Sequence, residues 1–433
     1  MNTASSPDKQ SALGFMGRAF RYRNYRLYFG GQGVSLIGTW MQQIAMSWLV
    51  YRLTNSAFYL GLIGFTGMAP MFFLTSFAGV FIDRMHRRNL LIITQILATI
   101  QASLLAFLTL SGHVHVWHLV ILSLFLGSIN AFDMPARQSF VIEIVENKED
   151  LGNAIALNSF MFNSARLVGP SIAGLVVAAI GEGPCFLLNA VSFLAIIGTL
   201  LAMKIPRRND EKRSASLFHG FKEGYRYVLG FPPIRYALFL LALTSLVGMP
   251  YVVLMPIFAK DILHGGPHTL GFLMGASGVG ALVGALYLAP RKSVLGLEKL
   301  IFIASSIFGA GLVVFSFSRY LPFSLFILLF TGFGMIIQMA STNTILQTIT
   351  DEDKRGRVMG FYTMAFGGAA PFGAVMAGSL ASKIGAPHTV IIGGTICIIG
   401  SLFFLKKLPL IQQSARSVYV KMGIIREKPV EPK

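Results

Sequence analysis

Charged residues are scarce in this chain, and acidic residues are the scarcest of them. Of its 433 residues only 12% are charged, 18 Asp and Glu stand against 36 Lys and Arg, 54% are hydrophobic, and the mean hydropathy is +0.66. A soluble domain carries about twice this share of charge. The composition therefore excludes an ordinary soluble domain and predicts an integral membrane protein.

Cysteine and the common enzyme motifs are also scarce. Cys185 and Cys397 lie far apart in apolar segments, which argues against a disulfide framework or a metal site and favours packing roles. The motifs G-x-x-x-x-G-K-[ST], H-E-x-x-H and G-x-S-x-G do not occur. We therefore expect no ATP hydrolysis, no cofactor, no bound metal and no catalytic residues.

The net charge of +18 does not indicate a nucleic-acid partner, because the basic residues form short clusters between apolar runs and build no continuous face. Successive loops between spans alternate between the two sides of the membrane. Counted this way, 30 of the 36 Lys and Arg residues lie on the same side as the termini. The other side carries only Arg52, Lys260, Arg319 and Lys383. Because Lys and Arg accumulate in cytoplasmic loops, both termini are expected in the cytoplasm.

Apolar segments long enough to cross a hydrocarbon core of about 30 Å occur twelve times, six on each side of a long polar connection. The expected spans are 27–51, 57–82, 90–110, 117–138, 153–180, 184–204, 236–259, 269–289, 299–318, 321–345, 357–383 and 387–405. The predicted fold class is an all-α integral membrane protein of two six-helix halves.

The same boundaries divide the chain into five parts. They are a cytoplasmic basic N-terminal segment (1–26), an N-terminal six-helix half (27–204), a cytoplasmic central loop (205–235), a C-terminal six-helix half (236–405) and a cytoplasmic basic tail (406–433). Residues 18–28 mix arginines with aromatics and are either a surface helix or a solvated tail. Residues 218–229 are amphipathic and are expected to form a helix along the inner surface.

One stretch occurs twice, at an offset of 204 positions. Residues 140–157 and 344–361 each contain an apolar run, a short acidic loop, a glycine and a new apolar run. At this offset Gly152 corresponds to Gly356, Gly169 to Gly373, Gly174 to Gly378 and Gly181 to Gly385. The repeat predicts two copies of one structural unit.

The end of the second span reads GVFIDRMHRR and carries a conspicuous set of residues: Gly79, Asp83, Arg84, Arg87 and Arg88. This pattern resembles the loop signature of the major facilitator superfamily. The resemblance implies that Asp83 meets the positive end of a helix from the other half, while Arg87 and Arg88 hold nearby carboxylates. The resemblance implies a latch for the inner gate.

The fifth span contains Gly169, Pro170 and Gly174, similar to the exporter signature of that superfamily. A Gly-Pro step lacks side-chain bulk and one backbone donor, which predicts a pliant point against the opposing half. With FDMPAR at 132–137 and RGRVMG at 355–360, the chain most resembles the bacterial siderophore (enterobactin) and macrolide exporters. This resemblance implies proton antiport, multidrug efflux and a multi-pass location in the bacterial inner membrane.

Two ionisable residues inside the expected spans are informative, because an unpaired charge in hydrocarbon is costly. Asp133 is either a proton carrier or a gate salt bridge to Arg88, Arg137 or Arg166, and its shallow position favours the salt bridge. Arg166 lies near the middle of its span, one turn before Pro170. It either faces an anionic or carbonyl-rich substrate or bonds the carbonyls freed by the proline.

Amide, aromatic and cationic side chains on the helices expected to line a central cavity favour a bulky amphipathic ligand. The candidates are Gln32, Trp40, Gln43, Asn130, Asn163, Arg166, Tyr251, Gln338 and Asn343.

These observations predict a monomeric secondary transporter that works by alternating access in a lipid bilayer, with a small-molecule substrate and protons as partners. A membrane enzyme acting on lipids is one alternative, although it would need clustered His, Asp or Glu at an interface. A protein of transporter shape that binds or senses without transport is the other.

Overall fold

The computed structural model describes residues 17–204, 217–291, 293–422 and 425, with side chains except at 75–84, 148, 217–223 and 421. These residues are predominantly helical and form no strand. Each expected span is a helix or a run of consecutive helices, as a bilayer requires of backbone groups that find no water.

The first bundle contains α2 (Arg23–Thr54), α3 (Ala57–Arg84), α4 (Arg87–Leu110), α5 (Val116–Ile144), α6 (Leu151–Ile180) and α7 (Glu182–Ala202). The second contains α9 (Pro232–Leu243), α10 (Tyr251–Ile257), α11 (Pro267–Leu288), α12 (Leu297–Phe317), α13 (Leu321–Ile349), α14 (Glu352–Thr363), α15 (Ala369–Ile384) and α16 (Ala386–Lys421). Three π-helical segments, η3 (Thr244–Gly248), η4 (Phe258–Ile262) and η5 (Met364–Gly368), continue α9, α10 and α14. Outside the bundles lie the 3-10 helices η1 (Arg18–Arg21) and η2 (Lys148–Asp150) and the helix α8 (Leu217–Gly230).

Eleven helical segments of the described chain are long and apolar enough to cross a membrane, and α2 is not among them. This helix of 32 residues carries several amides, which lower its hydropathy. The amides have partners inside the first bundle, because Gln42 donates to Gln101 at 3.0 Å and accepts from Asn189 at 2.8 Å. The span assigned to α2 therefore rests on its length and its packing against α6 and α7.

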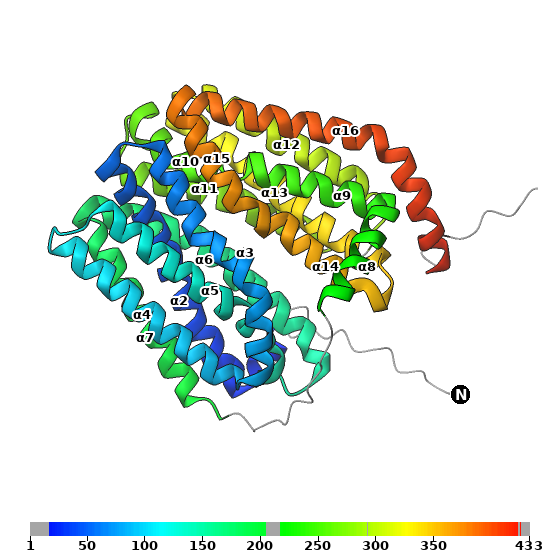
Figure 1. Ribbon diagram of the computed structural model, residues 1–433, viewed down its shortest axis with the longest axis horizontal. Helices are drawn as coiled ribbons and strands as arrows, with labels where there is room; N and C mark the ends of the chain where they lie inside the picture. Colours follow the sequence, from blue (N-terminus) through cyan, green and yellow to red (C-terminus); the bar gives the residue numbers. More distant parts are fainter. Residues whose placement is uncertain (1–16, 205–216, 292, 423–424, 426–433) are drawn as a thin grey trace, which may run out of the picture.

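The sequence repeat corresponds to equivalent elements of the two bundles (Figure 1). At the 204-residue offset, α6 and α15 end at Ile180 and Ile384, and a glycine follows each. Gly181 and Gly385 have φ of +86° and +84°, a region that glycine enters without steric cost. The two halves are thus built to one plan.

Two equivalent seams join the bundles through glycines. A Cβ on Gly174 of α6 would lie 2.9 Å from the Cα of Gly271 in α11. A Cβ on Gly378 of α15 would lie 2.8 Å from the Cα of Gly61 in α3. No side chain fits at these crossings, so the backbones themselves are in contact.

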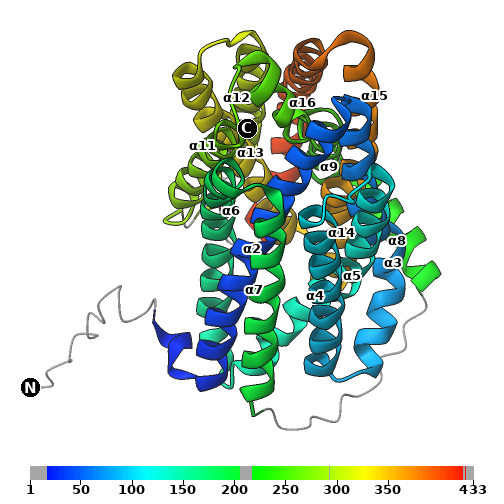
Figure 2. The same cartoon turned by 90° about the vertical axis from the view of Figure 1, so that its left-hand side faces the viewer.

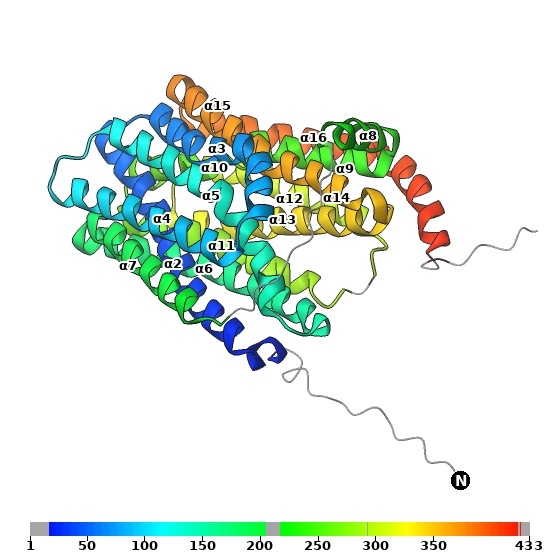
Figure 3. The same cartoon turned by 60° about the horizontal axis from the view of Figure 1, so that its bottom comes forward.

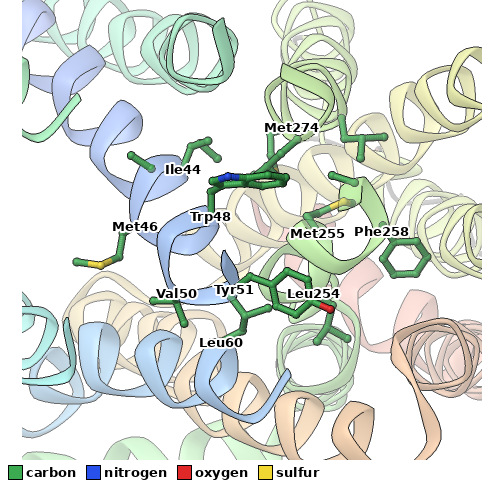
Figure 4. Close-up of a cluster of buried hydrophobic side chains, with 14 of the residues drawn as sticks. Ile44, Met46, Trp48, Val50, Tyr51, Leu60, Leu254, Met255, Phe258 and Met274 are labelled. Carbon is green, nitrogen blue, oxygen red and sulfur yellow. The ribbon is translucent and has the colours of Figure 1, made fainter. Parts of the chain in front are cut away.

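We call the end with the α2–α3, α6–α7 and α15–α16 connections the distal end, and the end with η1 and the α5–α6 connection the terminal end. At the distal end, side chains of both bundles form one apolar cluster, in which Trp48 and Tyr51 of α2 lie near Leu254 and Met274 (Figure 4). Away from it the bundles diverge. In Figure 2 the second bundle is seen nearly end-on while helices of the first run vertically.

The segment that precedes each bundle forms hydrogen bonds with an acidic loop of the sequence repeat, at the terminal end. Ala19 of η1 is fully buried, which a solvated tail would not allow. Tyr22 donates to Asp150 at 2.8 Å, and this hydrogen bond raises the pKa of Tyr22. Tyr227 of α8 donates to Asp351 at 3.2 Å. The amphipathic stretch is therefore a helix, as expected, and it lies against α14 (Figure 3).

The last helix, α16, continues beyond the expected end of its span at 405, as far as Lys421. Its buried side chains in this extension recur every three or four residues against the second bundle: Leu408, Ile411, Ala415 and Tyr419. The first part of the expected basic tail is thus an amphipathic helix that packs on the protein.

Candidate functional site

Arg166 of α6 lies between the two bundles, far from either end of its helix. Its Nη2 atom lies 3.8 Å from the sulfur of Met335 in α13, and its guanidinium carbon lies 5.9 Å from the ring centroid of Trp40 in α2. Tyr251 of α10 lies within electrostatic range. In the described part of the chain no carboxylate lies within 4 Å of it. Arg166 therefore contacts both bundles without an acidic partner.

These contacts bear on the two interpretations of Arg166. The helix-bend interpretation requires its guanidinium to donate to carbonyls freed by Pro170, and no such bond occurs among the described residues. α6 passes through Pro170 as one helix. Sulfur and an aromatic face satisfy few of the five guanidinium donors. The geometry favours a role in holding a polar or anionic ligand.

The candidate cavity residues differ in exposure: Gln43 is exposed, Trp40, Asn130, Asn163, Arg166 and Asn343 are half-buried, and Gln32, Tyr251 and Gln338 are buried. Gln338 donates to Thr244 at 2.9 Å, and the Tyr251 hydroxyl bonds with Ser277 at 2.8 Å. These two side chains thus have partners within the second bundle. Of the candidates, the structure brings Trp40, Arg166 and Tyr251 together and leaves the remainder dispersed.

A small cavity lies beside this group. It is lined by Met335 and Gln338 of α13, by Thr244 and Ser245 of η3, and by residues of α9, α12 and η5. Its volume of about 10 Å³ holds at most one water molecule. This cavity is therefore too small for a compound of drug size.

Asp133 lies in a polar cluster inside the first bundle. Its carboxylate is 1% exposed, accepts from Thr94 and Gln95 of α4 at 2.8 Å each, and pairs with Arg137 one turn along α5. Of the three arginines considered from the sequence, Arg137 is the observed partner. Thr94 and Gln95 were not foreseen, although two polar residues in an otherwise apolar helix are a detectable signal.

At the terminal end of α3, the side chains of Gly79, Asp83 and Arg84 lie outside the described residues, so their gate roles stay predictions. Arg87 pairs with Glu143 of α5 at 3.3 Å, consistent with the expected carboxylate contact.

Arg88 differs from this expectation. Its guanidinium donates to the carbonyls of Leu200 and Leu201 at 2.7 and 3.0 Å. These carbonyls belong to the last turn of α7, where intrahelical partners are missing. Arg88 therefore caps a helix in its own bundle.

The glycines of the fifth span face different neighbours. Gly174 meets the opposite bundle, and from the Gly-Pro step the Pro170 carbonyl does so too, since a Cβ on Gly271 of α11 would lie 2.7 Å from its oxygen. Gly169 lies against α2 of its own bundle, where an added Cβ would come within 2.5 Å of the Trp40 Cβ. Of these two glycines, Gly174 contributes to the seam between the bundles, whereas Gly169 lets α6 approach the Trp40 side chain closely.

The sequence analysis missed a polar group at the distal end. From the sequence, Lys260 was counted only among the basic residues that indicate membrane orientation, and no role was predicted for Asn55 or Asp261. The structure places these residues beside Tyr51, at the contact between the bundles.

Comparison with known proteins covers nearly the whole chain. A family model described as "Transmembrane secretion effector" matches residues 18–424. The staphyloferrin A transporter of Staphylococcus aureus is 25% identical over 389 residues, which are 88% of this chain and 96% of that protein. The multidrug efflux pump Tap of Mycolicibacterium fortuitum is 26% identical over 367 residues, with coverage of 83% and 88%. Macrolide efflux protein A of Streptococcus pyogenes is 24% identical over 396 residues, with coverage of 87% and 95%.

Solved structures show the same fold. A bacterial homolog of the human lysosomal transporter Spinster, in an inward-facing and occupied conformation, superposes with a TM-score of 0.71 at 12% identity and covers 94% of this chain and 99% of that one. The nucleoside transporter NupG has a TM-score of 0.67 at 12% identity, with coverage of 89% and 99%. Since the family model spans almost all residues and the two bundles have this transporter fold, the chain belongs to the transmembrane secretion effector family, a group of multi-pass transporters of the major facilitator superfamily.

Proposed function

We propose that this transporter exports small amphipathic organic compounds across the plasma membrane of a bacterium, as a monomer and in exchange for protons. Relatives named for the transport of a siderophore, of drugs and of macrolides support export of such compounds. The observation that carries the proposal is Arg166, a cation between the bundles whose neighbours are aromatic and sulfur side chains.

The shape of the molecule supports a cycle of alternating access. The bundles meet at the distal end and diverge toward the terminal end (Figure 1). With the terminal end in the cytoplasm, as the distribution of Lys and Arg indicates, a compound enters between the bundles from inside and reaches Arg166. Closing the terminal end and opening the distal end then releases it outside.

Asp133 and Arg137 are the groups we assign to proton coupling in this cycle. A proton that binds the Asp133 carboxylate cancels its charge and weakens the ion pair with Arg137. Because Asp133 also accepts hydrogen bonds from Thr94 and Gln95 of α4, its protonation weakens these bonds and changes the packing of α4 against α5. Proton entry and the inner gate would thereby be linked.

Efflux measured in pump-deficient bacterial cells tests the proposal. Cells that express the chain should accumulate less of a labelled amphipathic compound than cells without it, and an uncoupler should abolish the difference. Accumulation that stays the same across a broad panel would support a binding or sensing protein instead. Chemically altered lipid in the expressing cells would support an enzyme.

A further inference from the structure

We propose that Tyr51, Lys260 and Asp261 form a polar lock that holds the distal end closed and sets how readily the transporter opens there. The inference rests on the alternating access of the proposed function. It assigns positioning residues for the transport cycle at the end opposite the inner-gate signature of α3.

Three contacts join α2 of the first bundle to η4 of the second. The Tyr51 hydroxyl donates to the Asp261 carboxylate. The Lys260 ammonium donates to Asn55 Oδ1 at 2.7 Å and lies 5.4 Å from the centroid of the Tyr51 ring. Each side of the contact thus uses two side chains, and a hydrogen bond to a charged group is among the stronger kinds.

The local backbone at both sides suits this arrangement. Lys260 and Asp261 are consecutive, yet both reach α2. They lie in a π-helical turn, which has more residues per turn than an α-helix and so reduces the angle between successive side chains. Asn55 caps α2 with φ of +45°, a left-handed conformation that asparagine tolerates better than most residues.

The lock lies at the edge of an apolar contact between the bundles. Tyr51, Leu254 and Phe258 belong to the apolar cluster that both bundles share (Figure 4). The Tyr51 side chain is buried, whereas Asp261 and Asn55 are exposed, so the contacts of the lock lie where this cluster meets the surface. Arg52, the next cation along α2, pairs with Glu182 of α7 at 2.7 Å and stays within the first bundle. The distal end cannot open between α2 and η4 without breaking the Tyr51 and Lys260 contacts.

Cysteine accessibility in the full-length protein tests the lock. Val253 of α10 faces α3 across the seam, 3.4 Å from the position a Cβ on Gly64 would take. In a background with Cys185→Ala and Cys397→Ala, Val253→Cys reports distal opening through its reaction with a membrane-impermeant maleimide added outside intact cells. Tyr51→Phe removes the hydroxyl donor and Asp261→Asn removes the charge of the acceptor, so each should raise the labelling rate roughly tenfold. The double variant should exceed either single variant only slightly, because both act on the same bond.

Arg52→Gln is the matched control, since it removes a distal ion pair that lies within one bundle. Its labelling rate should stay at the level of the parent. An equal rise in Arg52→Gln would show general loosening and would overturn the lock. Unchanged labelling in Tyr51→Phe and Asp261→Asn, with monodisperse protein, would overturn it as well. Labelling needs no substrate, so the two proposals can fail separately. A protein that shows no efflux, but whose Tyr51 and Asp261 variants label faster, would refute the proposed export and support the lock.

Discussion

At the scale of single residues, Asp133 and Arg166 are ionisable side chains within spans that have opposite surroundings. Asp133 is surrounded by donors from Thr94, Gln95 and Arg137. Arg166 has only weak partners from Trp40 and Met335. A paired charge serves the protein's own structure and gating, whereas a charge with weak partners is available to a ligand.

Arg166→Ala should reduce transport of anionic compounds at least tenfold and that of neutral compounds much less. The reason is that a guanidinium gains most from a negatively charged ligand in a water-poor site. Efflux rates for matched anionic and neutral compounds measure the difference. Arg166→Lys is the control and should keep part of the preference; equal losses for both classes would contradict the anchoring role.

Asp133→Asn should destabilise the protein by about 3 kcal/mol, because it leaves the Arg137 guanidinium largely buried beside a neutral side chain. Thermal unfolding in detergent measures the loss. Asp133→Asn combined with Arg137→Gln should regain most of the stability, since the unpaired charge is gone. If the double variant folds well and its export is still abolished by an uncoupler, Asp133 has no role in proton coupling.

At the scale of the helices, the duplication is not perfect. In the described chain, the π-helical segments η3, η4 and η5 all interrupt the second bundle. The Ser245 hydroxyl of η3 donates to the Phe366 carbonyl of η5, which links two of them. Because π segments often occur at functional sites, we expect helix adjustments during transport to concentrate in the second bundle.

The glycine seams lead to a prediction at the same scale. In Gly61→Ala the new methyl would lie 2.6 Å from the Ala374 carbonyl and 2.9 Å from Gly378 Cα, so α3 and α15 must separate. Distal closure should weaken, transport should fall several-fold, and the Val253→Cys reporter should become more reactive from outside. Gly67→Ala lies on the same helix with nothing within 4 Å of the added carbon and should transport like the parent. Similar behaviour of the two variants would contradict the seam.

At the scale of the whole molecule, the distal end carries the four basic residues that the sequence predicts on the side opposite the termini. Arg52, Lys260, Arg319 and Lys383 all lie at or near distal ends of helices or in distal loops. The terminal end carries the other basic clusters of the described chain. This separation supports a distal end outside the cell.

Impermeant labelling in intact cells measures this orientation. Ser111→Cys, exposed in the distal α4–α5 connection, should react from outside. Ser417→Cys, exposed near the end of α16, should react only after the cells are permeabilised. The reverse pattern would invert the topology and with it the proposed direction of export.

The amino-acid sequence by itself determined the helical membrane class and the approximate positions of the spans, because hydrocarbon forces apolar segments of fixed length into helices. It also determined the two-fold repeat and the family, through residues that recur at one offset and through the loop motifs. Only the tertiary structure decided which side chains meet. Arg137 rather than Arg88 pairs with Asp133, Arg88 caps α7, and Tyr51 meets Asp261 about two hundred positions along the chain. Hydropathy sets where a helix runs, but helix rotation and the packing of small residues set its partners, and these depend on the whole bundle.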